Sequence, residues 1–328
     1  MLKGLLLFLC TLALAGLGTI SLAPFLWRLE PRFVALVPAA PQFAVAALLL
    51  ALGFLLLKAR KGALLALVVA LSNVAQLWPS LGDFSPGVEA QAGAVPPLKI
   101  ISFNLWYNNQ DPEATLAYLA ESGADVIGLV ETTPELKAAL APLKAVYPYG
   151  IDCVDRDPTC EIMLLSKHPL KNPYAGRIEG RWPYVAEAEL AWSGHPVTIA
   201  MTHISWPFLL PVHVTPDRAE FPDVPRLTQS LQAANLARHV NALPQDLILM
   251  GDFNSASWSA MQQAFRASTG LENRGHYLPS WPTYAWPILR LPIDQVFVRG
   301  EGRVTAMRLG PSVGSDHLPI EAEIAVGP

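Results

Sequence analysis

Three long stretches without a charged residue constrain this chain more than any other feature of its sequence. They lie between Lys3 and Arg28, between Arg32 and Lys58, and between Lys61 and Asp83. Each stretch is apolar and supplies the ~20 residues that an α-helix needs to cross the hydrocarbon core of a bilayer. We therefore expect residues 1–81 to form a membrane anchor of three transmembrane helices.

Two other interpretations of these stretches exist. The first alone would suit a signal peptide, but two more follow and no small-residue cleavage site is evident, which favours an uncleaved anchor. A buried helical hairpin of a soluble fold is the second alternative. Pro38 and Pro41 place the start of the second helix near Gln42. Polar side chains of the third helix should face neighbouring helices; they are Ser72, Asn73 and Gln76.

The basic residues of the loops predict the orientation of the anchor. The loop between the second and third stretches holds Lys58, Arg60 and Lys61, and Lys3 lies on the same side. The other short loop holds only two arginines, offset by one glutamate. Because cytoplasmic loops carry an excess of Lys and Arg, we expect everything after Leu81 to lie outside the cytoplasm.

The rest of the chain predicts a linker and one large domain. Residues 82–97 are rich in Gly, Ala, Pro and Ser and lack periodicity, which is typical of a linker. Residues 98–328 have the length of one α/β domain. Residues 85–328 hold 17 Lys and Arg against 25 Asp and Glu, a net charge of −8. This acidity argues against nucleic acid as a partner, because proteins that grip a polyanion are usually basic.

The cysteines agree with an exported domain. Cys10 lies inside the first apolar stretch, whereas Cys153 and Cys160 flank a short polar segment. A disulfide between these two would close a small loop, and exported compartments permit such a bond. Two free thiols in a loop are the alternative.

Apolar runs and helix signals alternate along the domain, which predicts an α/β layered fold. Expected strands cover residues 100–103, 125–130, 162–165, 197–202, 247–250 and 293–298. Expected helices run from Asp111 to Gly123 and from Pro225 through Val240.

Polar side chains follow these strands, where each strand reaches an edge of the fold. They are Asn104, Glu131, His203, Asp252, Asn254, Asp294, Asp316 and His317. Carboxylate and amide oxygens suit a hard cation such as Mg²⁺, and histidines suit proton transfer or stabilisation of negative charge. Each residue alone has a plainer interpretation; Asp252 and Asn254, for example, could simply form a turn. The sequence holds no Cys/His cluster for zinc, no phosphate-binding Gly-rich loop and no Gly-x-Ser-x-Gly motif.

Seven short motifs resemble, in order, those of the endonuclease/exonuclease/phosphatase superfamily, whose fold is that of deoxyribonuclease I. They are Ser-Phe-Asn104, the strand before Glu131, Ser166-Lys-His-Pro169, Thr202-His203, Gly251-Asp252-Phe-Asn254, Ile293-Asp294 and Ser315-Asp316-His317-x-Pro. The resemblance implies an α/β four-layer α/β/β/α sandwich. One departure is Val130, where many members have Gln before the Glu.

The resemblance also implies a role for each residue. Glu131 would be the principal metal ligand, helped by Asn104 and Asp316. Asp252, oriented by Asn254, would position or deprotonate the attacking water. His317, paired with Asp294, would contact the scissile phosphate, and His203 would bind phosphate or assist the leaving group. Mg²⁺ is the implied cofactor, with Mn²⁺ as the alternative.

The substrate is the least constrained expectation. The anchored architecture is similar to that of VanJ-type proteins, a membrane-anchored group of the superfamily. This similarity implies a lipid or lipid-linked phosphate at the outer face of the cytoplasmic membrane of a bacterium. An extracytoplasmic nuclease and an inactive binding module are the alternatives, and the oligomeric state is left open.

One apolar segment after His203 predicts contact with lipid. Residues 204–213 contain Trp206, Phe208 and Leu209, broken by Pro207 and Pro211, which disfavour a helix or central strand. We expect a loop that forms a membrane-facing lip of the site, because Trp is favoured at the membrane interface. The alternative is a loop that folds back onto its own domain.

Overall fold

The structure, a computed structural model, describes residues 1–26, 31–84, 95–207, 228–273 and 277–327. The chain divides into two compact units. The first is built around Met1–Leu81, and the second contains Gly82–Ser205, Gln229–Ser257 and Met261–Pro328.

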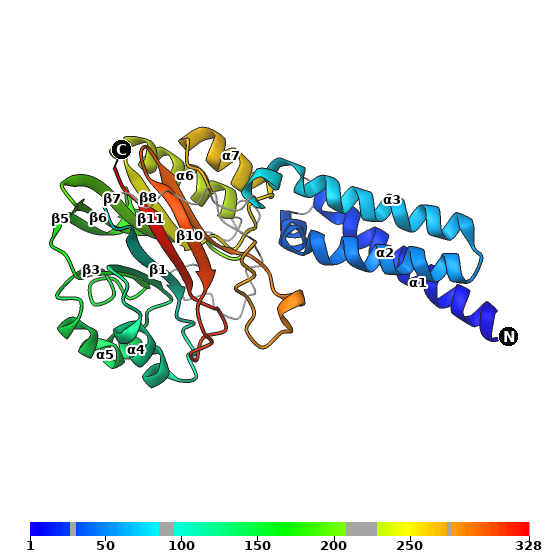
Figure 1. The fold of residues 1–328 in the computed structure, drawn as a ribbon, viewed down its shortest axis with the longest axis horizontal. Helices are drawn as coiled ribbons and strands as arrows, with labels where there is room; N and C mark the ends of the chain where they lie inside the picture. The colour runs from blue at the N-terminus through cyan, green and yellow to red at the C-terminus, as the bar shows by residue number, and fades with distance from the viewer. Residues whose placement is uncertain (27–30, 85–94, 208–227, 274–276, 328) are drawn as a thin grey trace. The chain divides into compact units, whose positions relative to one another are not determined.

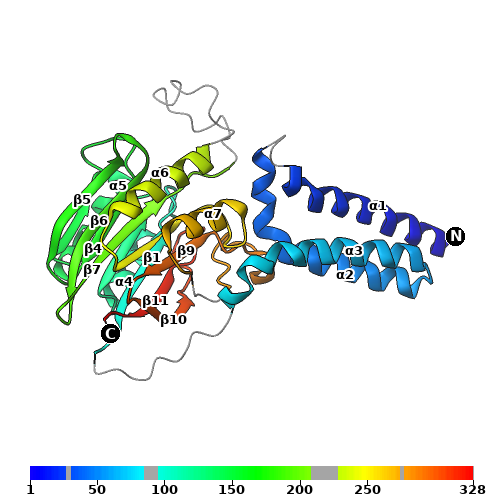
Figure 2. The same cartoon turned by 90° about the horizontal axis from the view of Figure 1, so that it is seen from above.

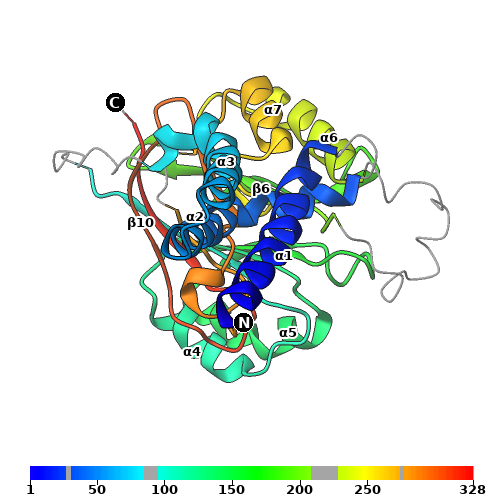
Figure 3. The ribbon, with the colours of Figure 1, turned by 90° about the vertical axis from the view of Figure 1, so that its right-hand side faces the viewer.

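Three helices of the first unit are long and apolar enough to cross a membrane, as expected, which is compatible with membrane anchoring. They are α1 (Leu2–Leu22), α2 (Ala40–Leu56) and α3 (Arg60–Leu77). The 3-10 helices η1 (Ala23–Leu26), η2 (Pro31–Ala39) and η3 (Trp78–Phe84) adjoin them. Figure 3 shows α2 and α3 side by side. Small buried residues allow this close approach; they include Ala44, Ala47 and Ala51 on α2 and Ala63, Ala66 and Ala70 on α3.

The polar side chains of α3 make hydrogen bonds within the first unit. The Asn73 side chain is buried, and its Nδ2 donates to Ser21 Oγ on α1 at 2.9 Å. Gln76 Nε2 donates to Asn73 Oδ1 at 3.4 Å. Ser72 Oγ instead donates to the carbonyl of Val69 on its own helix at 2.8 Å. Asn73 therefore faces a neighbouring helix, as predicted, because an amide left in hydrocarbon without a partner would be costly.

Two β-sheets form the centre of the second unit (Figure 1). The six-stranded sheet has the order β10-β11-β1-β2-β4-β3, and the five-stranded sheet the order β5-β6-β7-β8-β9. The first consists of β1 (Leu98–Asn104), β2 (Val126–Val130), β3 (Tyr149–Asp152), β4 (Ile162–Ser166), β10 (Arg303–Leu309) and β11 (Ile320–Ala325). The second consists of β5 (Leu170–Ile178), β6 (Arg181–Trp192), β7 (His195–His203), β8 (Leu247–Asp252) and β9 (Asp294–Arg299). The pairs β1–β2 and β7–β8 are parallel.

Strand alternation divides the apolar residues between three cores. Ile100 of β1 packs into the core between the sheets, whereas its neighbour Ile101 packs on the helix side. The two sheets pack tightly at Gly128 of β2. A Cβ atom there would lie 2.7 Å from Met201 Sδ and 2.8 Å from Met250 Cε, so a side chain at this position would require both methionines to move.

Helices cover both outer faces of the paired sheets. Helices α4 (Pro112–Glu121) and α5 (Pro134–Ala139) pack on the six-stranded sheet. Helices α6 (Thr228–Ala242) and α7 (Ala260–Thr269) pack on the five-stranded sheet (Figure 2). Figure 3 shows the resulting order, with α6 and α7 above the sheets and α4 and α5 below them. The predicted four-layer α/β/β/α sandwich is confirmed.

Five described strands were not predicted, namely β3, β5, β6, β10 and β11. Pro173 interrupts the apolar pattern of β5, and Pro183 that of β6. Strands β3, β5 and β10 lie at sheet edges, where exposed polar residues weaken the apolar signal of a strand.

The predicted disulfide is confirmed, because Cys153 is bonded to Cys160, and Cys10 is a free cysteine. Two other predictions fall partly outside the described residues. These are residues 85–94 of the expected linker and residues 208–213 of the expected lip.

Candidate active site

The polar strand ends meet at one edge of the second unit. Asn104 ends β1, and Glu131 follows the adjacent parallel strand β2. In the other sheet Asp252 is in register with His203 on β7 and with Asp294 on β9. Because parallel strands end at the same edge of a sheet, two neighbouring pairs bring these side chains together.

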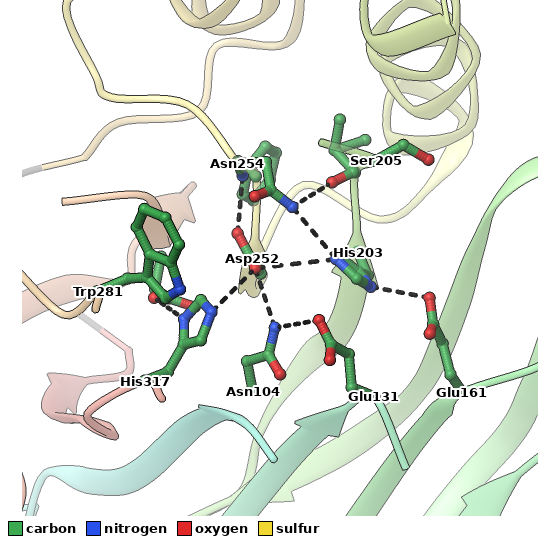
Figure 4. A network of polar contacts seen from close by, with 12 residues as sticks. Asn104, Glu131, Glu161, His203, Ser205, Asp252, Asn254, Trp281 and His317 are labelled. Carbon is green, nitrogen blue, oxygen red and sulfur yellow. Dashed lines mark hydrogen bonds and ion pairs between the residues drawn. The ribbon is translucent and has the colours of Figure 1, made fainter. Parts of the chain in front are cut away.

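Asn104 joins the two sheets at the centre of the site (Figure 4). Its Nδ2 donates to Glu131 Oε1 at 2.8 Å and to Asp252 Oδ2 at 3.0 Å. Its Oδ1 accepts from the backbone N–H of Trp106 at 2.8 Å, which fixes the orientation of the amide. One amide therefore holds two carboxylates side by side.

The backbone around Asp252 is unusual. A Cβ atom at Gly251 would lie 1.9 Å from the carbonyl oxygen of Thr202, so only glycine allows β8 to approach β7 here. Asn254 and Glu131 adopt left-handed conformations with φ of 48° and 55°. Such residues cost on the order of 1–3 kcal/mol each and cluster at functional sites. The Asn254 N–H donates to Asp252 Oδ1 at 2.7 Å, which orients the carboxylate.

His317 forms a buried pair with Asp294. Its Nδ1 lies 2.8 Å from Asp294 Oδ2, and Ser280 Oγ donates to the same carboxylate oxygen at 2.5 Å. Burial alone would lower the pKa of His317, but the Asp294 carboxylate outweighs it and raises the pKa to about 9. The imidazole is therefore a cation at neutral pH, and its Nε2 lies 3.8 Å from Asp252 Oδ2.

His203 forms a matching pair with Glu161, a residue that the sequence did not single out. Its Nδ1 lies 2.8 Å from Glu161 Oε1, and its Nε2 lies 3.8 Å from Asp252 Oδ2. Burial would lower the pKa of His203, but the Glu161 carboxylate raises it to about 10. Asn254 Nδ2 lies 3.3 Å from His203 Nε2 and donates to the carbonyl of Ile204 at 2.9 Å.

Asp252 is balanced between opposing influences. Burial and, after it, the neighbouring Asp294 raise the pKa of its carboxyl, while His317 and His203 oppose the rise and leave it at about 7. A carboxyl with this pKa exchanges its proton readily near neutral pH, as a general base must.

The oxygen atoms around Asp252 fit a divalent cation. Carboxylate oxygens of Glu131 and Asp252 lie within 4.8 Å of each other, as do those of Asp252 and Asp294. Asp316 Oδ1 is buried, accepts no hydrogen bond, and lies 3.9 Å from His317 Nε2. A buried carboxylate oxygen without a hydrogen bond would be satisfied by a bound cation, and an oxygen-rich set suits a hard one.

The structure brings all eight predicted site residues to the same edge. The described residues add Glu161, which orients His203, and Trp281, whose Nε1 donates to Asp316 Oδ2 at 3.0 Å. Glu161 could have been found from its place directly before an expected strand. Because β4 runs antiparallel to β2, the start of β4 lies beside the end of β2, where Glu131 lies.

The two-sheet sandwich with a carboxylate, amide and histidine cluster at one edge defines a class of metal-dependent phosphoester hydrolases. The sequence profile of the Endonuclease/Exonuclease/phosphatase family matches residues 101–317, so the chain belongs to that family. Members of the family hydrolyse phosphoester bonds with a divalent metal. The predicted class of enzyme is thereby confirmed.

Solved structures share the fold at low sequence identity. A humanized TDP2 from D. rerio is 17% identical with a TM-score of 0.53, covering 70% of this chain and 99% of that chain. An endonuclease/exonuclease/phosphatase from Beutenbergia cavernae is 16% identical with a TM-score of 0.53, covering 71% and 72%. The beta toxin of Staphylococcus aureus is 15% identical with a TM-score of 0.51, covering 69% and 99%. Among curated proteins, no sequence matches this chain.

Proposed function

We propose that this protein is a membrane-anchored, Mg²⁺-dependent phosphoesterase that hydrolyses a phosphate ester or pyrophosphate of a lipid or lipid-linked substrate. The observation that carries the proposal is the position of Asp252. It lies 3.8 Å from the Nε2 atoms of both His203 and His317, and each of these histidines is paired with an acid. A base flanked by two cations is suited to water attack on a phosphorus atom whose oxygens gain negative charge.

Each residue has a role in hydrolysis. Asp252, oriented by the Asn254 N–H, positions the water and takes its proton as the new P–O bond forms. His317, held by Asp294, donates from Nε2 to a phosphoryl oxygen and stabilises the charge that develops there. His203, held by Glu161, binds phosphate or protonates the leaving oxygen as the old P–O bond breaks.

Asn104, Glu131 and Asp316 would hold the cation. Glu131 has a carboxylate at the centre of the site, and Asp316 contributes the buried oxygen that lacks a hydrogen bond. The oxygen of Asn104 accepts one hydrogen bond, and an amide oxygen has a second lone pair. When bound, the cation would supply Lewis acidity toward the phosphate. Mg²⁺ fits because it prefers oxygen ligands; beta toxin, which shares the fold, has been solved with bound magnesium ions.

Topology and charge support a membrane substrate. The three apolar helices would keep the domain, residues 98–328, beside a bilayer through the linker at residues 82–97. The loop that holds Lys58, Arg60 and Lys61 favours an outward-facing domain. The disulfide agrees with an exported compartment. The net charge of −8 over residues 85–328 disfavours a nucleic-acid polyanion.

A substrate panel tests the proposal. Full-length protein in detergent would be assayed for Mg²⁺-dependent hydrolysis of polyprenyl pyrophosphates, phospholipids, and single- and double-stranded DNA. We expect phosphate release from a lipid phosphate, lost in Asp252→Asn and kept in the control Asp155→Asn, whose side chain is exposed. Cleavage of DNA without release from any lipid would replace the proposal with an extracytoplasmic nuclease. Inactivity on every substrate would favour a binding module.

A further inference from the structure

A loop beside the active site exposes a group of large apolar side chains. Within the part of the second unit that the structure describes, residues 281–291 follow Ser280 and include the 3-10 helix η7 (Pro287–Leu289). The exposed fractions of Tyr284 and Trp286 are 78% each, and those of Ile288 and Leu289 are 68% and 57%. An apolar group of this kind at the surface marks an interaction site. The loop, drawn in orange, projects from the sheets in Figure 1.

The fold of the loop holds these side chains outward. Backbone hydrogen bonds between Trp281 and Leu291, at 3.2 and 2.5 Å, close its base. The guanidinium of Arg290 donates to the carbonyl of Ala285 at 3.1 Å and to that of Thr283 at 2.9 Å. The exposure of the apolar residues is therefore a property of an ordered loop.

The base of the loop is part of the catalytic centre. Trp281 Nε1 donates to Asp316 Oδ2 at 3.0 Å, and its ring lies 6.3 Å from that of His317 (Figure 4). The Thr283 N–H donates to the carbonyl of Asp316 at 2.8 Å. Whatever binds the exposed side chains is thus brought to the edge of the site.

We propose that the surface formed by Tyr284, Trp286, Ile288 and Leu289 inserts into the boundary between headgroups and acyl chains of a lipid bilayer. This inference deepens the proposed function and rests on it for the membrane. Tyr and Trp are the residues enriched at that boundary, since each has an apolar body and a polar end. Residues 281–293 contain no acidic residue, and their only charged residue is Arg290, which suits an anionic lipid surface.

The anchor favours the bilayer as the binding partner of this surface. The expected linker of residues 82–97, fully extended, reaches about 55 Å, so the domain can never be farther than that from the membrane. Tethering removes most of the loss of translational freedom that a soluble protein would suffer on binding. Inserted, the loop would present the Asp252 centre to phosphates at the headgroup level without lifting the lipid from the bilayer.

Depth measurement tests the insertion without any assay of activity. Full-length protein with Cys10→Ser and Trp286→Cys would carry an environment-sensitive fluorophore, because Cys153 and Cys160 are bonded to each other. It would be reconstituted in vesicles of phosphatidylcholine and phosphatidylglycerol, with and without a nitroxide near the top of the acyl chains. The control is Ala138→Cys, at an exposed position on α5.

We expect the nitroxide to quench the label at position 286 and to leave that at position 138 unchanged. The same label, attached through Leu289→Cys in a second variant, shows whether quenching at 286 is caused by the loss of Trp286 itself. The proposal is overturned if the nitroxide quenches neither the label at 286 nor that at 289. It is also overturned if both labels are shielded from the nitroxide in a manner that depends on protein concentration, because a second copy of the protein would then cover the loop.

Kinetics separates this inference from the proposed function. The triple variant Tyr284→Ser, Trp286→Ser and Leu289→Ser should raise the apparent KM for a lipid phosphate in vesicles by about tenfold or more, as expected for lost burial of apolar side chains. It should leave hydrolysis of the soluble diester bis(p-nitrophenyl) phosphate unchanged, as should the matched control Tyr149→Ser, which removes an exposed aromatic residue of β3. Quenching without hydrolysis of any lipid would retain the insertion and reject the lipid substrate. Equal losses on both substrates would show that the loop supports the fold instead.

Discussion

The two histidine–acid pairs on either side of Asp252 share two contacts but differ in their exposure to solvent. In both, Nδ1 lies 2.8 Å from a carboxylate and Nε2 lies 3.8 Å from Asp252 Oδ2. The side chains of His317 and Asp294 are 5% and 3% exposed, whereas those of His203 and Glu161 are 13% and 33% exposed. One pair is sealed inside the protein, and the other opens toward solvent.

This difference separates two tasks. A buried pair is held rigidly and interacts strongly in its low-dielectric surroundings, which suits a group that stabilises transition-state charge. A pair in contact with water can exchange protons with it and can accommodate different leaving groups. We therefore expect the His317 pair to govern the rate of the chemical step. We expect the His203 pair to limit activity at high pH only when its carboxylate is removed. The variants below test this division, from the largest expected effect to the smallest.

Replacing Asp252, the carboxylate that both histidines approach, should have the largest effect on the rate. Asp252→Asn keeps the acceptor for the Asn254 N–H but cannot take a proton, so we expect kcat to fall by about 10²–10⁴-fold. Stopped assays of phosphate release, beside thermal melting to confirm folding, provide the measurement. Turnover near that of the wild type at saturating Mg²⁺ would mean that Asp252 is not the base.

Breaking the buried pair should have the next largest effect. Asp294→Asn removes the carboxylate that keeps His317 protonated, and a lost charge stabiliser typically lowers kcat by about 10²–10³-fold. KM should change little, because the interaction strengthens mainly in the transition state. A rise in KM at constant kcat would place His317 in ground-state binding instead.

Breaking the open pair should move the pH profile. In the wild type, kcat/KM should rise with pH as Asp252 loses its proton, with a midpoint at about 7. A bound cation would lower that midpoint. The value of kcat/KM should fall above about pH 9 as His317 loses its proton. Glu161→Gln removes the main cause of the raised pKa of His203. The descending limb should then shift to lower pH, with a loss of about tenfold at neutral pH.

Steady-state rates across the pH range, in buffers of constant ionic strength, measure both limbs. Glu187→Gln is the matched control, because Glu187 pairs with His239, outside the catalytic cluster. An unchanged descending limb in Glu161→Gln would show that the two pairs are not separable in this way.

Removing the disulfide should have the smallest effect on activity, and it should act only through the pair of His203 and Glu161. Glu161 follows Cys160 directly, and its carbonyl accepts from the Thr132 N–H at 3.0 Å, so the closed loop helps to position it. The double variant Cys153→Ser and Cys160→Ser should lose about 2–3 kcal/mol of stability. Its pH profile should resemble that of Glu161→Gln in a weaker form. A descending limb unchanged from that of the wild type would contradict this link.

The sequence predicts the site residues that lie in local motifs better than the partners that come from distant segments. Asp252 and Asn254 follow an apolar strand, and His317 lies in a compact motif, so local patterns reveal them. Glu161 acts only because β4 begins where β2 ends, and the order of strands in a sheet is not a local property. The bond from Trp281 to Asp316 likewise joins residues 35 positions apart.

The central strands of the fold were also predictable from local patterns, whereas the edge strands were not. Central strands such as β8 are buried on both faces and form continuous apolar runs, which indicate them clearly. In β10, exposed and buried residues alternate irregularly around a shift in register between Val304 and Ala306. A pattern of that kind cannot be distinguished from a loop without its neighbour β11.

Mg²⁺ titration of phosphate release by the full-length protein tests the central claim most directly. The wild type and Glu131→Gln would be compared on one lipid phosphate in vesicles, after removal of metal with a chelator. The account predicts no release without metal, saturable recovery with Mg²⁺ in the wild type, and recovery at much higher Mg²⁺ or none in Glu131→Gln. Release that persists in the chelator, or an identical Mg²⁺ dependence in the two proteins, would contradict a metal centre at Glu131.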